Sequence, residues 1–167
     1  MTIAPALWSA PAETQRRILQ RVLLWISPAE YAPRGTQLGQ LLARLSNGQA
    51  ATLAGVRFVH GRGGLRALRE VRATAPRCAV DQIWDGRWQV AGDLPQGAEL
   101  GALDAAGLAQ CPDWRSTGLP RAALLASPAV WLGERVVAAP LAGFGSPAIR
   151  ALPLHPLLGP KNLALSH

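Results

Sequence analysis

Arginines are the side chains whose number and spacing best indicate chemistry in this chain of 167 residues. A guanidinium group is permanently charged, and its planar fork of N–H donors matches the oxygens of a phosphate. Several such groups close together therefore predict binding to a nucleic acid through its backbone. The predicted contacts are Arg34 and a dense run made up of Arg57, Arg62, Arg66, Arg69 and Arg72.

The net charge of the chain is confined to its first half. Up to Ala75 there are ten arginines and three acidic residues, which gives a formal charge of +7. From Pro76 onward, six arginines and Lys161 balance seven acidic residues. This imbalance predicts a polyanionic partner that binds the first half, with nucleic acid as the first candidate. The alternative is a non-catalytic protein-interaction module whose basic face binds an acidic protein.

The other polar residues form no catalytic or metal-binding pattern. His60, His155 and His167 are widely separated, and the acids of the second half never form a close pair. Cys78 and Cys111 lack the spacing of a metal or redox motif, which favours a reducing cytosol. No apolar run approaches the roughly 18–20 residues of a membrane span. We therefore assign no catalytic residue, metal ligand or cofactor, and we expect a cytoplasmic protein without membrane contact.

In the first half, apolar spacing predicts two helices followed by a strand. Residues 11–26 and 36–45 both place leucines and other apolar residues on one helical face. Residues 56–59 favour a strand, and residues 61–64, Gly-Arg-Gly-Gly, favour a turn. That turn lacks the Gly-Lys-Ser/Thr ending of a phosphate loop. Residues 65–72 fit either a strand or a short helix, and periodicity leaves both open.

The second half is predicted to be mainly β. Asp85-Gly86 between Trp84 and Trp88 is a strong hairpin signal, and it places Asp85 on the surface. A short helix is expected over residues 120–126, and a second hairpin over residues 128–139. Four prolines after residue 146 predict an extended or flexible tail. Of the six tryptophans, Trp114 beside Arg115 is the one expected to be exposed, and most of the others are expected to pack in cores.

Several short motifs occur in an order typical of one enzyme family. They are residues 31–34 (Tyr-Ala-Pro-Arg), the leucine-rich residues 38–45, residues 48–55 (Gly-Gln-Ala-Ala-Thr-Leu-Ala-Gly), residues 68–70 (Leu-Arg-Glu), residues 119–121 (Leu-Pro-Arg), residues 128–131 (Pro-Ala-Val-Trp) and residues 133–140. This order resembles the region that follows the catalytic domain in tRNA(Ile)-lysidine synthases, over roughly residues 2–145. On this resemblance, residues 65–71 become a strand paired with residues 56–59.

The resemblance implies ATP-dependent attachment of lysine to the wobble cytidine of a tRNA(Ile) with a CAU anticodon. The family's catalytic domain opens with Ser-Gly-Gly-x-Asp-Ser, a loop that grips ATP, and this sequence contains no such motif. We therefore expect a tRNA-binding accessory region without ligase activity of its own, with ATP bound in a missing domain. A fragment, a truncated gene product and one half of a split enzyme all remain open. The expected partners are tRNA and that catalytic domain, and a homodimer is left open.

The second half departs from the family pattern in two places. Residues 103–108 contain no basic residue where many members have a basic Gly-Gly-Arg-x-Leu-Lys segment, and Leu124 stands where an arginine is usual. Binding to tRNA is therefore expected mainly before Pro76. The predicted fold is α+β, with a basic two-helix and β-hairpin subdomain over residues 1–75. A small mixed, mainly β subdomain over residues 76–146 and a proline-rich tail over residues 147–167 are expected to follow.

Overall fold

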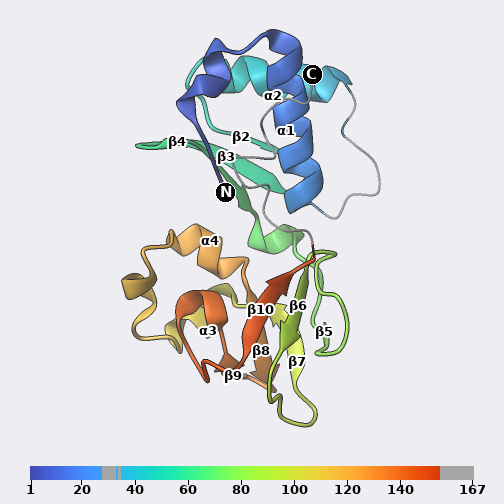
Figure 1. Ribbon diagram of the computed structural model, residues 1–167, viewed down its shortest axis with the longest axis vertical. Coiled ribbons are helices and arrows are strands. Elements are labelled where there is room, and N and C mark those ends of the chain that lie inside the picture. Colours follow the sequence, from blue (N-terminus) through green and yellow to red (C-terminus); the bar gives the residue numbers. More distant parts are fainter. Residues whose placement is uncertain (28–32, 34, 155–167) are drawn as a thin grey trace. The chain divides into compact units, whose positions relative to one another are not determined.

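The computed structural model describes residues 1–27, 33 and 35–154, which form two compact units (Figure 1). The first unit is Met1–Glu70, and the second begins at Val71. Both combine helices with antiparallel sheet, which confirms the predicted α+β class. The sequence placed the boundary five residues later, at the change of charge. None of the helices in the described parts of the chain is long and apolar enough to cross a membrane.

Helices cover one side of a four-stranded antiparallel sheet in the described part of the first unit (Figure 1). The sheet order is β1-β4-β3-β2, which leaves β1 and β2 as edge strands. The elements are β1 (Thr2–Ile3), a 3-10 helix (Pro5–Ser9), α1 (Ala12–Ile26), α2 (Gly35–Ser46), β2 (Ala51–Leu53), β3 (Val56–Gly61) and β4 (Gly64–Arg69). Both predicted helices are present within two residues of their expected ends.

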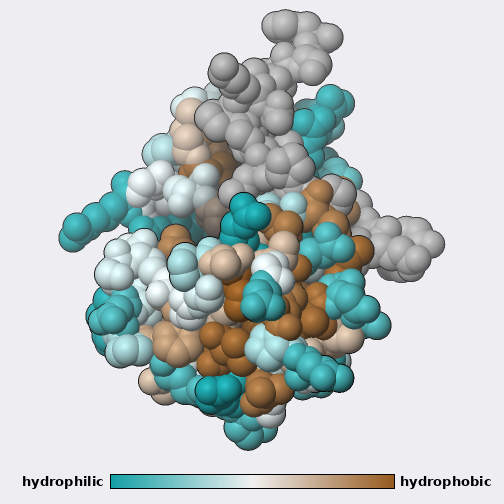
Figure 2. Space-filling view, turned by 60° about the horizontal axis from the view of Figure 1, so that its bottom comes forward, coloured by the Kyte–Doolittle hydropathy of each residue, from teal (hydrophilic) through white to brown (hydrophobic). Residues whose placement is uncertain are grey.

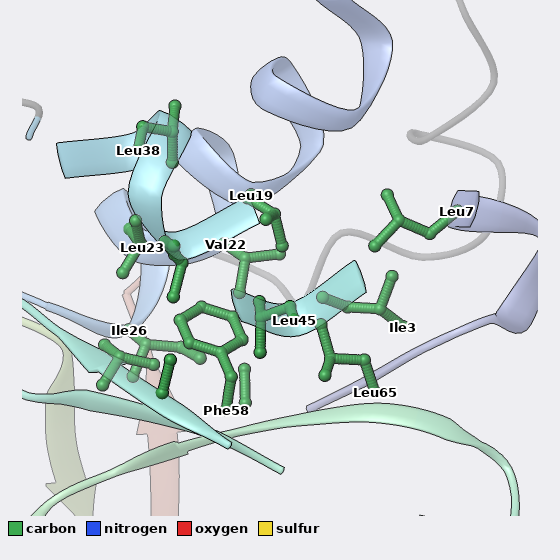
Figure 3. Packing of buried hydrophobic residues seen from close by; sticks show 14 residues of the cluster. Ile3, Leu7, Leu19, Val22, Leu23, Ile26, Leu38, Leu45, Phe58 and Leu65 are labelled. Carbon is green, nitrogen blue, oxygen red and sulfur yellow. The ribbon is translucent and has the colours of Figure 1, made fainter. Parts of the chain in front are cut away.

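The core of the first unit lies between the two helices and the sheet. Phe58 of β3 is fully buried among apolar side chains of both helices, including Leu19, Val22 and Leu45 (Figure 3). These residues come from the apolar stripes that predicted the helices. Burying each such side chain contributes about 1.5–3 kcal/mol. The same packing fixes which face of β3 and β4 points toward the helices, and therefore which face remains outside.

Two tight turns connect the strands of the first unit. Ala54 and Gly55 join β2 to β3, and both have positive φ, at 50° and 71°. Such a pair corresponds to a type I′ turn, whose twist suits a two-residue hairpin. Arg62 and Gly63 join β3 to β4, which pair from Val56↔Arg69 to Gly61↔Gly64. Residues 64–69 are therefore a strand, as the family resemblance implied, and a 3-10 helix (Val71–Ala73) follows.

The second unit contains two separate antiparallel sheets in its described residues. One has the order β5-β7-β8-β9, and the other pairs β6 with β10. The elements are β5 (Cys78–Ala79), β6 (Trp88–Ala91), β7 (Glu99–Ala102), α3 (Asp104–Ala109), a 3-10 helix (Trp114–Thr117), α4 (Arg121–Leu125), β8 (Pro128–Leu132), β9 (Arg135–Ala138), a 3-10 helix (Pro140–Ala142) and β10 (Arg150–Pro153). The predicted helix near residues 120–126 and the hairpin over residues 128–139 are both present.

The hairpin expected around Asp85-Gly86 is wrong beyond its turn. Asp85 and Gly86 have positive φ, as a type I′ turn requires. The main chains of Trp84 and Trp88 exchange hydrogen bonds across the turn. The ladder does not extend past this pair, and Nε1 of Trp84 donates to the carbonyls of Ala75 and Pro76, at 3.1 Å each. The strand that pairs with β6 is instead β10, from within the expected tail. The remainder of that tail, from residue 155, lies outside the described residues.

The segment over residues 103–108, which lacks basic residues, builds part of a core. It forms α3, which packs against the fully buried Trp131 of β8. Gly107 permits this contact, since a methyl group there would lie 2.7 Å from the indole ring. Nε1 of Trp131 donates to the carbonyl of Ala102 at 3.1 Å. The segment therefore has a packing role in the second unit.

Candidate nucleic-acid interface

The two units differ sharply in charge. Residues 1–70 hold nine arginines and three acids, which gives a formal charge of +6. Residues 71–156 hold seven arginines and seven acids and are formally neutral. The boundary in the structure therefore separates a basic unit from a neutral one, five residues before the boundary placed from the sequence. A polyanion would be attracted mainly to the first unit.

Alternation along the strands places Arg57 and Arg66 on the sheet face opposite the helices. Arg57 lies between the buried Val56 and Phe58, and Arg66 between the buried Leu65 and Ala67. Side chains on a strand alternate between the two faces, so both arginines point away from the core. The register agrees with this placement. Arg66 pairs with Val59, which lies two residues after Arg57 and so on the same face of β3. These two predicted contacts thus share one surface.

Arg62 lies at the tip of the β3–β4 turn and is exposed. A methyl group at Gly61 would lie 3.2 Å from Nε of Arg66, so the Arg66 side chain extends along Gly61. Arg62 and Arg66 are therefore near the same end of the sheet. Together, Arg57, Arg62 and Arg66 form what we call the outer-face arginines. All three are placed where a phosphate backbone could reach them.

The other predicted contacts are not on this surface. Arg69 is half-buried, and its Nη1 donates to the carbonyl of Ala54 at 3.3 Å, which ties it to the β2–β3 turn. Arg72 is exposed but belongs to the second unit. Arg34 lies outside the described residues. The dense run of arginines in the sequence is thus divided by the fold, and only part of it shares one face.

Sequence reasoning missed Arg44, which lies in the last turn of α2. It borders two hollows beside the edge strand β2, of about 180 Å³ and about 380 Å³. Gln37 and Gln40 precede it at helical spacing and line the smaller hollow. Thr52 lines both hollows, and Arg57 lines the larger one. The polar stripe at residues 37, 40 and 44 was the available signal, since it runs beside the buried leucines of the same helix.

His60 has a structural role. Its Nε2 lies 3.0 Å from the carbonyl oxygen of Leu45, and its ring stacks on Trp8 with centroids 6.2 Å apart. Because a carbonyl oxygen only accepts hydrogen bonds, Nε2 must carry a proton and donate it. The ring thereby links β3 to the end of α2. This hydrogen bond and stacking account for a histidine at this position.

The two cysteines are poor nucleophiles. Burial raises the pKa of Cys78, and the nearby charges of Asp81 and Glu99 raise it further. Burial also raises the pKa of Cys111, whose Sγ lies 3.4 Å from the carbonyl of Gly107. Both thiols therefore remain protonated near neutral pH. Within the described ranges, no three His, Cys, Asp or Glu residues gather closely enough to hold a metal ion.

The surface of the second unit has a different character. Hydrophobic side chains form a broad area on the face shown in Figure 2. The exposed large hydrophobic residues in the described part of the second unit are Ile83, Leu119, Leu132, Leu152 and Leu154. Trp114, which the sequence placed on the surface, is half-buried, and the Arg115 guanidinium lies 4.5 Å from its ring centroid. This apolar, neutral surface is less suited to a polyanion than that of the first unit.

Comparison with known proteins finds a curated relative that matches most of the chain. The chain is 43% identical over 140 residues to a tRNA(Ile)-lysidine synthase of Ruegeria pomeroyi. The resemblance to this family is confirmed. The match covers 81% of the present chain but 33% of the relative, as expected for a C-terminal region. The chain thus spans about a third of the length of the curated relative it matches. No family model matches the chain, and no solved structure does.

Proposed function

We propose that this chain is the tRNA-binding accessory region of a tRNA(Ile)-lysidine synthase. The observation that carries the proposal is the 43% identity to such an enzyme over most of the chain. The match supports a region of a tRNA-modifying ligase. The basic first unit, with its outer-face arginines, supports tRNA as the bound partner. Because contacts to phosphate and sugar position a protein without reading sequence, this region would hold the tRNA rather than select the anticodon.

The proposal assigns the chemistry to another domain of the enzyme. An ATP-binding domain with a Ser-Gly-Gly-x-Asp-Ser loop would activate the wobble cytidine and attach lysine, while the present chain positions the tRNA in the cytoplasm. The isolated chain should then form no lysidine from ATP, lysine and tRNA. An in-frame Ser-Gly-Gly-x-Asp-Ser sequence directly upstream of Met1 in the genome would support this division. Lysidine formation by the isolated chain would contradict it.

Binding to tRNA should depend strongly on salt. If about five phosphates are contacted, the slope of log K against log salt concentration should be roughly −3.5 to −4.5. The measurement is a titration of labelled tRNA at several salt concentrations. Duplex DNA and an acidic protein serve as competitors at matched salt. A flat response to salt, or preference for the acidic protein, would overturn the proposal in favour of a protein-interaction module.

A further inference from the structure

Two hollows follow the outer edge of β2 and together make what we call the β2 groove. The smaller lies between α2 and β2 and is lined by Gln37, Gln40, Leu41, Arg44, Ala51, Thr52 and Leu53. The larger is lined by Arg44, Ala50, Ala51, Thr52, Arg57 and Glu70. Arg44, Ala51 and Thr52 line both hollows, so these are two parts of one depression. The groove therefore continues from the helix side of β2 to the sheet face that holds Arg57.

Main-chain groups of β2 also face this groove. β2 is the last strand of its sheet, and no strand pairs with its outer edge in the part of the chain that the structure describes. Leu53 and Val56 flank the two-residue turn, so they form the first hydrogen-bonded pair of the hairpin. The alternation of an antiparallel ladder then directs the N–H and C=O of Thr52 away from β3. An amide donor therefore lies between the two arginines.

We propose that the β2 groove binds one phosphodiester of the RNA backbone, with Arg44 and Arg57 as the charged contacts. This inference rests on the proposed tRNA-binding function and adds Arg44 to it. Arg44 of α2 and Arg57 of β3 are both exposed, and both line the larger hollow. Thr52 of β2 lies between these two elements. Two guanidinium groups and a main-chain N–H are the donors that phosphate oxygens accept best. The side-chain amides of Gln37 and Gln40 supply further donors in the smaller hollow.

Glu70 is the one acid of the groove, and it provides a second test of the same idea. Its Oε1 accepts a weak hydrogen bond from Oγ1 of Thr52 at 3.5 Å. A carboxylate at this place repels a phosphate and attracts the neighbouring guanidinium groups. Removing its charge should therefore strengthen RNA binding. A groove made for a cationic partner would show the opposite responses to the losses of Arg44 and of Glu70.

The experiment compares charge removal inside the groove with the same removal elsewhere in the first unit. Arg44→Gln is matched by Arg17→Gln on α1, whose side chain is 73% exposed and pairs with Glu13 at 3.1 Å. Both variants are made in the full chain, and labelled tRNA is titrated at several salt concentrations. Arg44→Gln should weaken binding about tenfold or more, as expected for loss of a charged hydrogen bond. Its salt slope should become shallower by about 0.7–0.9, which is one phosphate contact.

Arg17→Gln should change affinity less than about threefold and should leave the salt slope unchanged, because Arg17 contacts no phosphate in this proposal. In the second pair, Glu70→Gln should tighten binding while Glu13→Gln should not. Equal losses for Arg44→Gln and Arg17→Gln would overturn the groove and leave the proposed function intact. A wild-type chain that binds no tRNA would overturn both. Thermal melting of each variant verifies that the fold is retained.

Discussion

Asp85 is fully buried within the second unit, and both oxygens of its carboxylate accept hydrogen bonds there. Oδ1 accepts from the main-chain N–H of Ala75 at 3.1 Å, and Oδ2 accepts from Nη2 of Arg87 at 2.8 Å. Its side chain is 0% exposed and that of Arg87 is 11% exposed. An ion pair taken this far out of water is stable only while both charges remain. The turn therefore holds the segment near Ala75 in place, in addition to reversing the chain.

Asp85→Ala should be among the most destabilising single substitutions in the second unit. It leaves the guanidinium of Arg87 buried without its carboxylate, and we expect a loss of about 3–5 kcal/mol in the free energy of unfolding. Urea unfolding followed by tryptophan fluorescence measures this, since Trp84 is adjacent. Asp93→Ala, at an exposed acid of the same unit, should cost less than about 0.5 kcal/mol. Equal costs would show that the buried pair contributes little.

At the scale of elements, the β2–β3 turn carries a residue in an unfavourable conformation. Ala54 has φ of 50°, a region that Asn and Gly adopt more readily than Ala. Its carbonyl also accepts the hydrogen bond from Arg69. The turn therefore combines the geometry that a two-residue hairpin needs with a side chain poorly suited to it. This turn sets the register of β2, and so the position of Thr52 in the β2 groove.

Ala54→Asn should stabilise the first unit by about 0.5–1 kcal/mol, because Asn-Gly is the preferred pair for a type I′ turn. The main-chain contact to Arg69 is retained. Urea unfolding measures the gain, and tRNA affinity should stay unchanged because the register of β2 is preserved. Gly55→Ala should instead lower the free energy of unfolding by about 1 kcal/mol, because alanine adopts the φ of 71° at this position less readily than glycine. A loss of stability in Ala54→Asn would contradict the assigned turn.

Elements with local signals were predictable from the sequence, and elements that depend on distant pairing were not. Apolar periodicity was sufficient for α1 and α2, whereas the Gly-rich turn located the end of β3 and only the family resemblance identified β4 as its partner strand. The pairing of β6 with β10 joins residues about sixty positions apart, and nothing local specifies that register. The Asp-Gly turn was predicted correctly, but the predicted surface position of Asp85 is wrong, because its carboxylate is bonded to Ala75 and Arg87 inside the unit. Local chemistry predicts a turn without predicting what covers it.

At the scale of the whole chain, net charge was readable from the sequence but its arrangement on surfaces was not. Arg57 and Arg66 share a face because they sit on alternating positions of paired strands. Arg69, three residues after Arg66, is turned toward Ala54 instead. Arg44 lies thirteen residues before Arg57 in the sequence. The packing of α2 beside β2 brings the two arginines to the same hollow. Spacing along the chain therefore predicted which unit is basic, but not which arginines share a face.

Matched charge reversals can determine whether the basic unit is the functional one. The first variant changes the outer-face arginines, Arg57, Arg62 and Arg66, to Glu. The second changes three exposed arginines of the second unit, Arg121, Arg135 and Arg150, to Glu. Arg69 and Arg87 are excluded because their side chains stabilise the fold through Ala54 and Asp85. Both variants change the net charge equally, so a difference between them reports position alone.

The first variant should weaken tRNA binding by about 100-fold or more, since three phosphate contacts become repulsive. Its salt slope should become shallower by roughly 2–3. The second variant should lose less than about tenfold, because its charges lie on the neutral unit and are screened beyond a Debye length of about 10 Å at 0.1 M salt. Titration of labelled tRNA over a range of salt measures both. Equal losses would mean that tRNA responds only to total charge, and the division between a basic and a neutral unit would then carry no function.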